Sequence, residues 1–91
     1  LTQDDIEKIV KLQMDKLAKR LSAVNVNMEY TSAVVSWIAK NGYQKNYGVR
    51  PIRRLIQTQI EDKISEQIIT RQVNKINIDV VDNEIEVQSI L

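Results

Sequence analysis

Three arginines at the start of a predicted helix are the residues of this chain whose types and spacing could do chemistry. Arg50, Arg53 and Arg54 surround Pro51, which favours the first turn of a helix because its missing N–H would have no intrahelical partner there. That end of a helix is electropositive, so each cation loses a few tenths to about 1 kcal/mol unless an anion is nearby. Gly48 permits a tight turn or a close approach to a backbone or ligand just before them. The pattern predicts an anion-binding site.

No phosphate-binding loop accompanies these arginines. A P-loop has two glycines flanking four residues, followed by Lys and Ser or Thr, whereas Gly42 and Gly48 flank five residues and precede Val49 and Arg50. The absence of Cys and His excludes the usual zinc ligand sets and Cys/His nucleophilic catalysis, so we expect no metal site. The carboxylates fall at helix starts, in mid-helix or in a turn. We therefore expect that the chain alone is not an enzyme and cannot build its own nucleotide pocket.

The composition predicts one small domain. The chain has 91 residues, of which 43% are hydrophobic and 27% charged, and its 13 basic and 12 acidic residues give no general attraction to nucleic acid or membrane. No apolar run approaches the roughly 20 residues of a membrane span, and the first residues lack the pattern of a signal peptide. We expect a soluble domain of the cytoplasm or of an organelle lumen or matrix, with the compartment left open. The start without methionine suggests a fragment of a longer protein.

The N-terminal segment predicts an amphipathic helix over about residues 3 to 22. Thr2 and Asp5 resemble a capping box, and apolar residues follow at helical spacing. This apolar stripe consists of Ile6, Val10, Met14, Leu17 and Leu21. Ile9 and Leu12 widen it, which is compatible with a broad core or with an external contact.

The middle of the chain predicts a short strand and a second helix. Residues 26 to 30 alternate between apolar and polar, which is typical of a half-buried strand. Thr31 is a candidate N-cap for a helix that runs to about Asn41 and whose end is marked by Gly42. Its predicted apolar face consists of Ala33, Val34, Trp37 and Ile38. We interpret Trp37 as a core residue rather than as a stacking platform.

A third and longer helix is predicted to begin near Val49 or Pro51 and to continue to about Arg71. Its apolar residues are Ile52, Leu55, Ile56, Ile60, Ile64 and Ile68. A helix with apolar residues over this length must pack along much of it.

The C-terminal segment predicts a β-hairpin. Apolar residues alternate over 76 to 80 and again over 85 to 87, and Asp82-Asn83 between them supplies turn chemistry. The order of elements is helix, strand, two helices and two strands. It predicts a single α+β domain over residues 1–91, in which a small three-stranded sheet packs with three helices.

The arginine turn resembles a signature of the Clp ATPases, which are AAA+ unfoldases. Gly42-Tyr43 followed by Tyr47-Gly48-Val49-Arg50-Pro51-Ile52-Arg53-Arg54 is similar to the Gly-Tyr and Tyr-Gly-Ala-Arg-Pro-Leu-Arg-Arg motifs of that family. The resemblance extends over essentially the whole chain, through Ile9-Val10-Lys11-Leu12-Gln13, Leu17, Leu21, Ile56-Gln57 and Ile60-Glu61-Asp62. The Leu12-Gln13 pair and the complete hairpin resemble the ClpB-type disaggregases most closely.

The resemblance implies that this is the small, or lid, subdomain that follows the second AAA+ module. Arg50 matches the sensor-2 arginine, which in the family reaches the terminal phosphates of ATP. The preceding large subdomain holds most of the nucleotide and its Mg²⁺ and carries the catalytic acid. The implied partners are that large subdomain, adjacent subunits of a homo-hexamer and, through the rest of the chain, unfolded polypeptide.

The other predicted site residues have weaker roles. Arg53 and Arg54 match the family's following arginine pair, but they point about 100° apart on a helix, so at most one shares the side of Arg50. We interpret both as interface residues. Ile9 and Gln13 lie on the helix that faces the adenine side in such ATPases.

Three positions depart from the family pattern. Val49 replaces an alanine and slightly crowds the turn, Gln44-Lys45 replaces Asp-Pro and leaves the loop less rigid, and Lys63 replaces a frequent proline, so a straighter third helix is expected. None of these changes affects Arg50.

Alternative functions remain open. The same lid could serve a protease-partnered Clp unfoldase or an export-driving Clp motor. A distant alternative is an independent anion or nucleic-acid binding module that uses the three arginines with Lys40 and Lys45, although the near-neutral net charge argues against it. The broad apolar face of the first helix motivates a third class, a purely structural oligomerisation domain.

Overall fold

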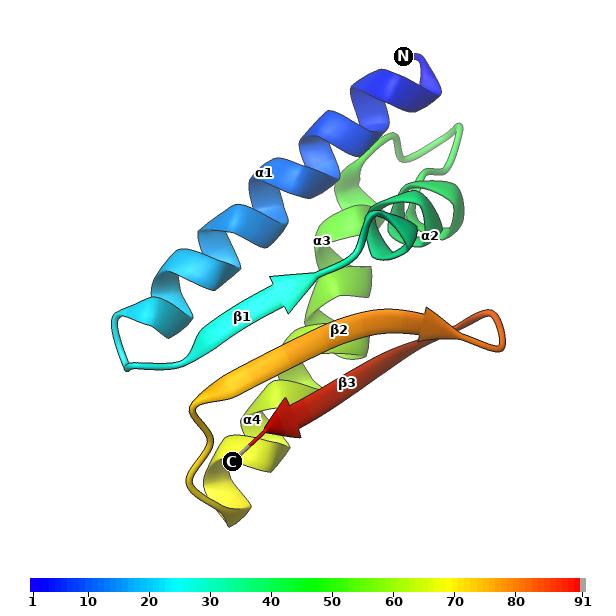
Figure 1. Ribbon diagram of the computed structural model, residues 1–91. Helices are drawn as coiled ribbons and strands as arrows, with labels where there is room; N and C mark the ends of the chain where they lie inside the picture. Colours follow the sequence, from blue (N-terminus) through cyan, green and yellow to red (C-terminus); the bar gives the residue numbers. More distant parts are fainter. Residues whose placement is uncertain (91) are drawn as a thin grey trace.

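Three helical stretches and a three-stranded mixed sheet form an α+β fold, as the sequence predicts (Figure 1). The structure is a computed structural model that describes residues 1–90. In chain order the elements are α1 (Gln3–Ser22), β1 (Asn27–Tyr30), α2 (Ser32–Gly42), α3 (Arg50–Ile56), the π-helical η1 (Gln57–Glu61), α4 (Asp62–Thr70), β2 (Lys75–Val81) and β3 (Glu84–Ile90).

The first helix has the predicted cap and the predicted buried face. The Thr2 hydroxyl accepts a hydrogen bond from the Asp5 N–H at 3.1 Å, and the Asp5 carboxylate accepts one from the Thr2 N–H at 3.1 Å. This is a complete capping box, which satisfies N–H groups at the helix start. All five residues of the predicted stripe are buried, so the spacing identified the core face of α1.

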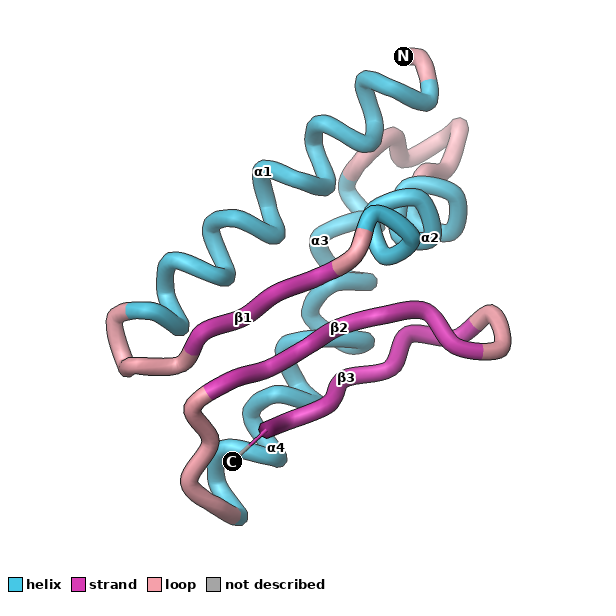
Figure 2. The backbone as a smooth tube through the Cα atoms, in the orientation of Figure 1, coloured by secondary structure: helices cyan, strands magenta, loops and turns pink. Residues whose placement is uncertain are grey.

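The sheet has the order β1-β2-β3 and supports the predicted hairpin. β1 pairs with β2 in parallel, and β2 pairs with β3 in antiparallel register, with Ile78 opposite Val87. Asp82 and Asn83 both have positive φ, at 52° and 63°, which is the backbone of a type I′ hairpin turn. Figure 2 shows the three strands side by side, with the helical segments α2 to α4 connecting β1 to β2.

The second helix departs from the predicted details. Ala33 is exposed, whereas Val35 and Ala39 are buried, so the core face is rotated from the one that the sequence indicated. The Thr31 side chain makes no N-cap hydrogen bond, and its hydroxyl donates to the Asp79 carboxylate at 2.8 Å. Trp37 packs against the core as expected.

The third helical stretch begins at Arg50 and ends at Thr70, close to the predicted limits, but it is not one regular α-helix. The π-helical segment η1 interrupts it, and the sequence analysis did not predict this segment. Ile52, Ile56, Ile60 and Ile64 are all buried at strict four-residue spacing. In an α-helix such a repeat drifts by about 40° per step. The wider π turn, with its i→i+5 hydrogen bonds, offsets that drift and keeps the isoleucines on one face.

Candidate functional site

A short turn delivers the chain to the arginine helix. The Gln44 N–H donates to the Gly48 carbonyl at 3.1 Å, and the Gly48 N–H donates to the Gln44 carbonyl at 2.6 Å. Gly48 has φ +62°, in the left-handed region that favours glycine. The turn ends directly before Val49, and Arg50 opens α3 with Pro51 in its first turn, as predicted.

None of the three predicted arginines has a carboxylate partner within residues 1–90. Arg50, Arg53 and Arg54 are all exposed. The ion pairs of the described chain join Arg20 to Glu61 and Lys75 to Glu29. The first turn of α3 also carries no acidic residue. Within the described part of the chain, the arginine turn thus has no carboxylate counter-charge.

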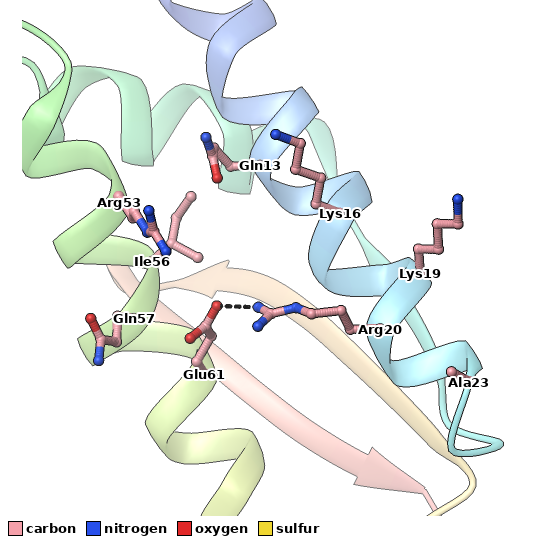
Figure 3. Close-up of a pocket in the computed structure, with 9 residues that line it drawn as sticks. All are labelled: Gln13, Lys16, Lys19, Arg20, Ala23, Arg53, Ile56, Gln57 and Glu61. Carbon is pink, nitrogen blue, oxygen red and sulfur yellow. Dashed lines mark hydrogen bonds and ion pairs between the residues drawn. The ribbon is translucent and has the colours of Figure 1, made fainter.

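A groove of about 720 Å³ separates α1 from the α3–η1 stretch, and it takes in only part of the predicted site. Gln13 from α1 and Arg53 from α3 both line it (Figure 3). Arg50, Arg54 and Ile9 do not line this groove. The structure thus brings Gln13 together with Arg53 at this groove, and Arg50 does not line it.

Additional cations line the same groove and were missed by the sequence reasoning. They are Lys16, Lys19 and Arg20 of α1. An Arg20 guanidinium N–H donates to Glu61 Oε1 at 2.6 Å, which ties α1 to η1 (Figure 3). The spacing of three cations over five residues, i, i+3 and i+4, was a usable signal because it places them on one helix face.

The apolar surface of α1 is wider than the core requires. Ile9 is half-buried, and the neighbouring Leu12 is 57% exposed. The predicted external contact of this face therefore has an exposed side chain available to it. No helix among residues 1–90 combines the length and the apolar character that crossing a membrane requires.

The fold and the arginine turn together define the class of small subdomain that follows an AAA+ module in Clp ATPases. Residues 1–81 match the family model described as the C-terminal, D2-small domain of ClpB protein. The chain therefore belongs to the ClpB D2-small domain family.

Curated relatives agree with this assignment. The chain is 39% identical over 88 residues to the chaperone protein ClpB of Prochlorococcus marinus, covering 93% of this chain and 10% of the relative. It is 40% identical over 75 residues to ClpB of Malacoplasma penetrans, covering 82% and 11%. It is also 36% identical over 92 residues to the negative regulator of genetic competence ClpC/MecB of Bacillus subtilis, covering 98% and 11%. The chain thus spans about a tenth of the length of these relatives.

Proposed function

We propose that this chain is the lid subdomain of a hexameric, ATP-driven protein disaggregase and that Arg50 is its sensor-2 arginine. In this proposal Arg50 contacts the terminal phosphates of ATP, which a large subdomain of the same polypeptide binds together with Mg²⁺. The observation that carries the proposal is the exposed Arg50 guanidinium at the start of α3, without a carboxylate partner in residues 1–90. The ClpB relatives, which are described as chaperones, support the disaggregase class.

The coupling between nucleotide and lid follows from the energy of one contact. A charge-assisted hydrogen bond to phosphate contributes about 1.5–3 kcal/mol, which draws the lid toward the large subdomain while ATP is bound. Loss of the terminal phosphate removes that contribution. One hydrophobic core joins all helices and strands of the lid, so the lid rotates as a rigid body when the contact is lost. A hexamer would convert these rotations into force on a threaded polypeptide.

A second candidate is the same lid in a protease-partnered Clp unfoldase or an export-driving Clp motor. The observation in its favour is the similarity to ClpC/MecB, which extends over 98% of this chain. Arg50 has the same role in each of these machines.

The test uses a full-length protein that carries this sequence. Arg50→Ala is expected to lower ATP hydrolysis and aggregate reactivation by about tenfold or more, because a loss of 1.5–3 kcal/mol corresponds to at least that factor. Arg71→Ala is the matched control, since Arg71 is also exposed but lies at the other end of the helical stretch. Normal activity of Arg50→Ala would overturn the role of Arg50. Tight binding of the chain itself to nucleic acid would instead favour the independent binding module.

A further inference from the structure

The groove between α1 and the α3–η1 stretch concentrates positive charge. Its charged lining consists of Lys16, Lys19, Arg20 and Arg53 against the single carboxylate of Glu61. The groove therefore carries a net charge of +3, whereas the whole chain carries +1. Lys16 and Lys19 project from α1 beside the groove in Figure 3, and neither has an ion-pair partner in residues 1–90.

The groove already holds one carboxylate. Glu61 approaches Arg20 to 2.6 Å, although the two residues are 41 positions apart in the chain. Their side chains remain 33% and 66% exposed, so the pair lies at the surface and exchanges partners at little cost. Arg20 is thus placed to donate hydrogen bonds to a carboxylate of a second polypeptide in place of Glu61.

The irregular backbone of the third helical stretch forms one wall of this groove. Gln57 and Glu61, the first and last residues of the π turn, both line it. π turns within α-helices occur frequently at functional sites. In Figure 3 the Glu61 carboxylate points across the groove to Arg20 of α1, whereas the Gln57 amide lies on the side of the stretch away from α1.

A second, smaller cavity of about 200 Å³ is also lined by Arg20 and Glu61. Both residues line the two cavities, so the ion pair divides a basic section from an apolar section. The apolar section includes Leu17 and Ile64, and Ile68 is 37% exposed at its edge. This second section has space for an apolar side chain beside the basic one.

We propose that this groove binds an acidic segment of a partner polypeptide. Carboxylates of the segment pair with Lys16, Lys19 and Arg53, and one displaces Glu61 from Arg20. An adjacent apolar side chain enters the section beside Ile68. The groove is poorly suited to nucleic acid because no aromatic residue lines it for base stacking. This binding does not involve Arg50, which does not line the groove.

The test measures fluorescence anisotropy of a labelled peptide with the full-length protein. The probe is a peptide of alternating Glu and Ala with one central Leu. Lys16→Glu/Lys19→Glu is expected to weaken its binding by about tenfold or more, because two attractions become repulsions. Lys8→Glu/Lys11→Glu is the matched control, since it makes the same charge change at the same spacing on exposed residues of α1 outside the groove. The control is expected to weaken binding by less than about twofold.

A change of opposite sign gives an independent test. Glu61→Gln removes the carboxylate that competes for Arg20, so it is expected to strengthen binding of the acidic peptide by about threefold or more. Circular dichroism establishes that each variant is folded. Equal weakening by the two lysine pairs, no effect of Glu61→Gln, absence of peptide binding, or tighter binding of an oligonucleotide than of the peptide would each overturn the proposal.

Discussion

Gly42 lies directly against Ile52, so that α2 and α3 approach each other where only a hydrogen atom fits. A Cβ atom on Gly42 would lie 2.9 Å from Ile52 Cγ1 and 3.1 Å from its Cα. Ile52 is 1% exposed and belongs to the core. Gly42 is the last residue of α2, and Gly48 is the glycine with positive φ in this structure. Gly42 therefore serves helix packing next to the arginine turn rather than the left-handed helix ending that its sequence position indicated.

Replacement of Gly42 by alanine is expected to destabilise the fold by about 1–3 kcal/mol, because the contact with the Ile52 backbone leaves the added methyl no low-cost escape. Urea denaturation of this chain measures the change in the free energy of unfolding. Lys40→Ala, an exposed substitution in the same helix, is the control and is expected to change it by less than about 0.5 kcal/mol. A neutral or stabilising Gly42→Ala would show that the two helices separate easily.

Substitution of Gly48 is predicted to destabilise the fold through backbone strain rather than through crowding. Nothing lies within 4 Å of a Cβ placed there, but its φ of +62° is unfavourable for residues with a side chain. Gly48→Ala is expected to cost about 1 kcal/mol, and Gly48→Asn less, because asparagine tolerates the left-handed region. The order of the two destabilisations should reverse at Gly42, where asparagine, being larger, is expected to cost more stability than alanine. The same order at both sites would contradict this distinction between strain and crowding.

The sequence predicted the elements better than it predicted their contacts. The hydrophobic period of α1 and the alternation of β2 and β3 identified the core-facing side of each element, because each pattern reports one face of one element, although Val80 and Val87 are only partly buried. The four-residue spacing of Ile52, Ile56, Ile60 and Ile64 contained the signal for η1, but a run of buried isoleucines also fits an ordinary helix. The groove could not be predicted because it depends on Arg20 meeting Glu61, a tertiary contact between residues far apart in the chain.

The Tyr30 hydroxyl gives the fold a predictable sensitivity to alkaline pH. It donates to the Asp15 carboxylate at 2.7 Å and so joins β1 to α1. Burial, followed by the hydrogen bond and the charge of Asp15, raises the pKa of Tyr30 from 10.0 to about 12. Because the folded pKa lies above the unfolded value, this contribution to stability is complete below about pH 10 and is lost as the pH rises toward 12.

Tyr30→Phe is therefore expected to cost about 0.5–1.5 kcal/mol at neutral pH, and this difference from the unsubstituted chain should shrink between about pH 10 and 12. Urea denaturation at several pH values measures this difference in the free energy of unfolding. Tyr47→Phe is the control, because Tyr47 is 62% exposed and its substitution should give no such pH-dependent difference. A Tyr30→Phe penalty that stayed constant over this range would contradict the raised pKa.

The three arginines of the α3 turn are predicted to have separable functions because they face different surroundings. Arg53 lines the groove with Gln13, whereas Arg50 and Arg54 do not. In the full-length protein, Arg50→Ala should weaken ATP binding by about tenfold, while Arg53→Ala and Arg54→Ala should change it by less than about twofold. Arg53→Ala alone should weaken binding of the acidic peptide, by about threefold or more. Equal loss of ATP affinity in all three variants would indicate a general electrostatic field at the start of α3, and the assignment of Arg50 as the specific phosphate contact would then be wrong.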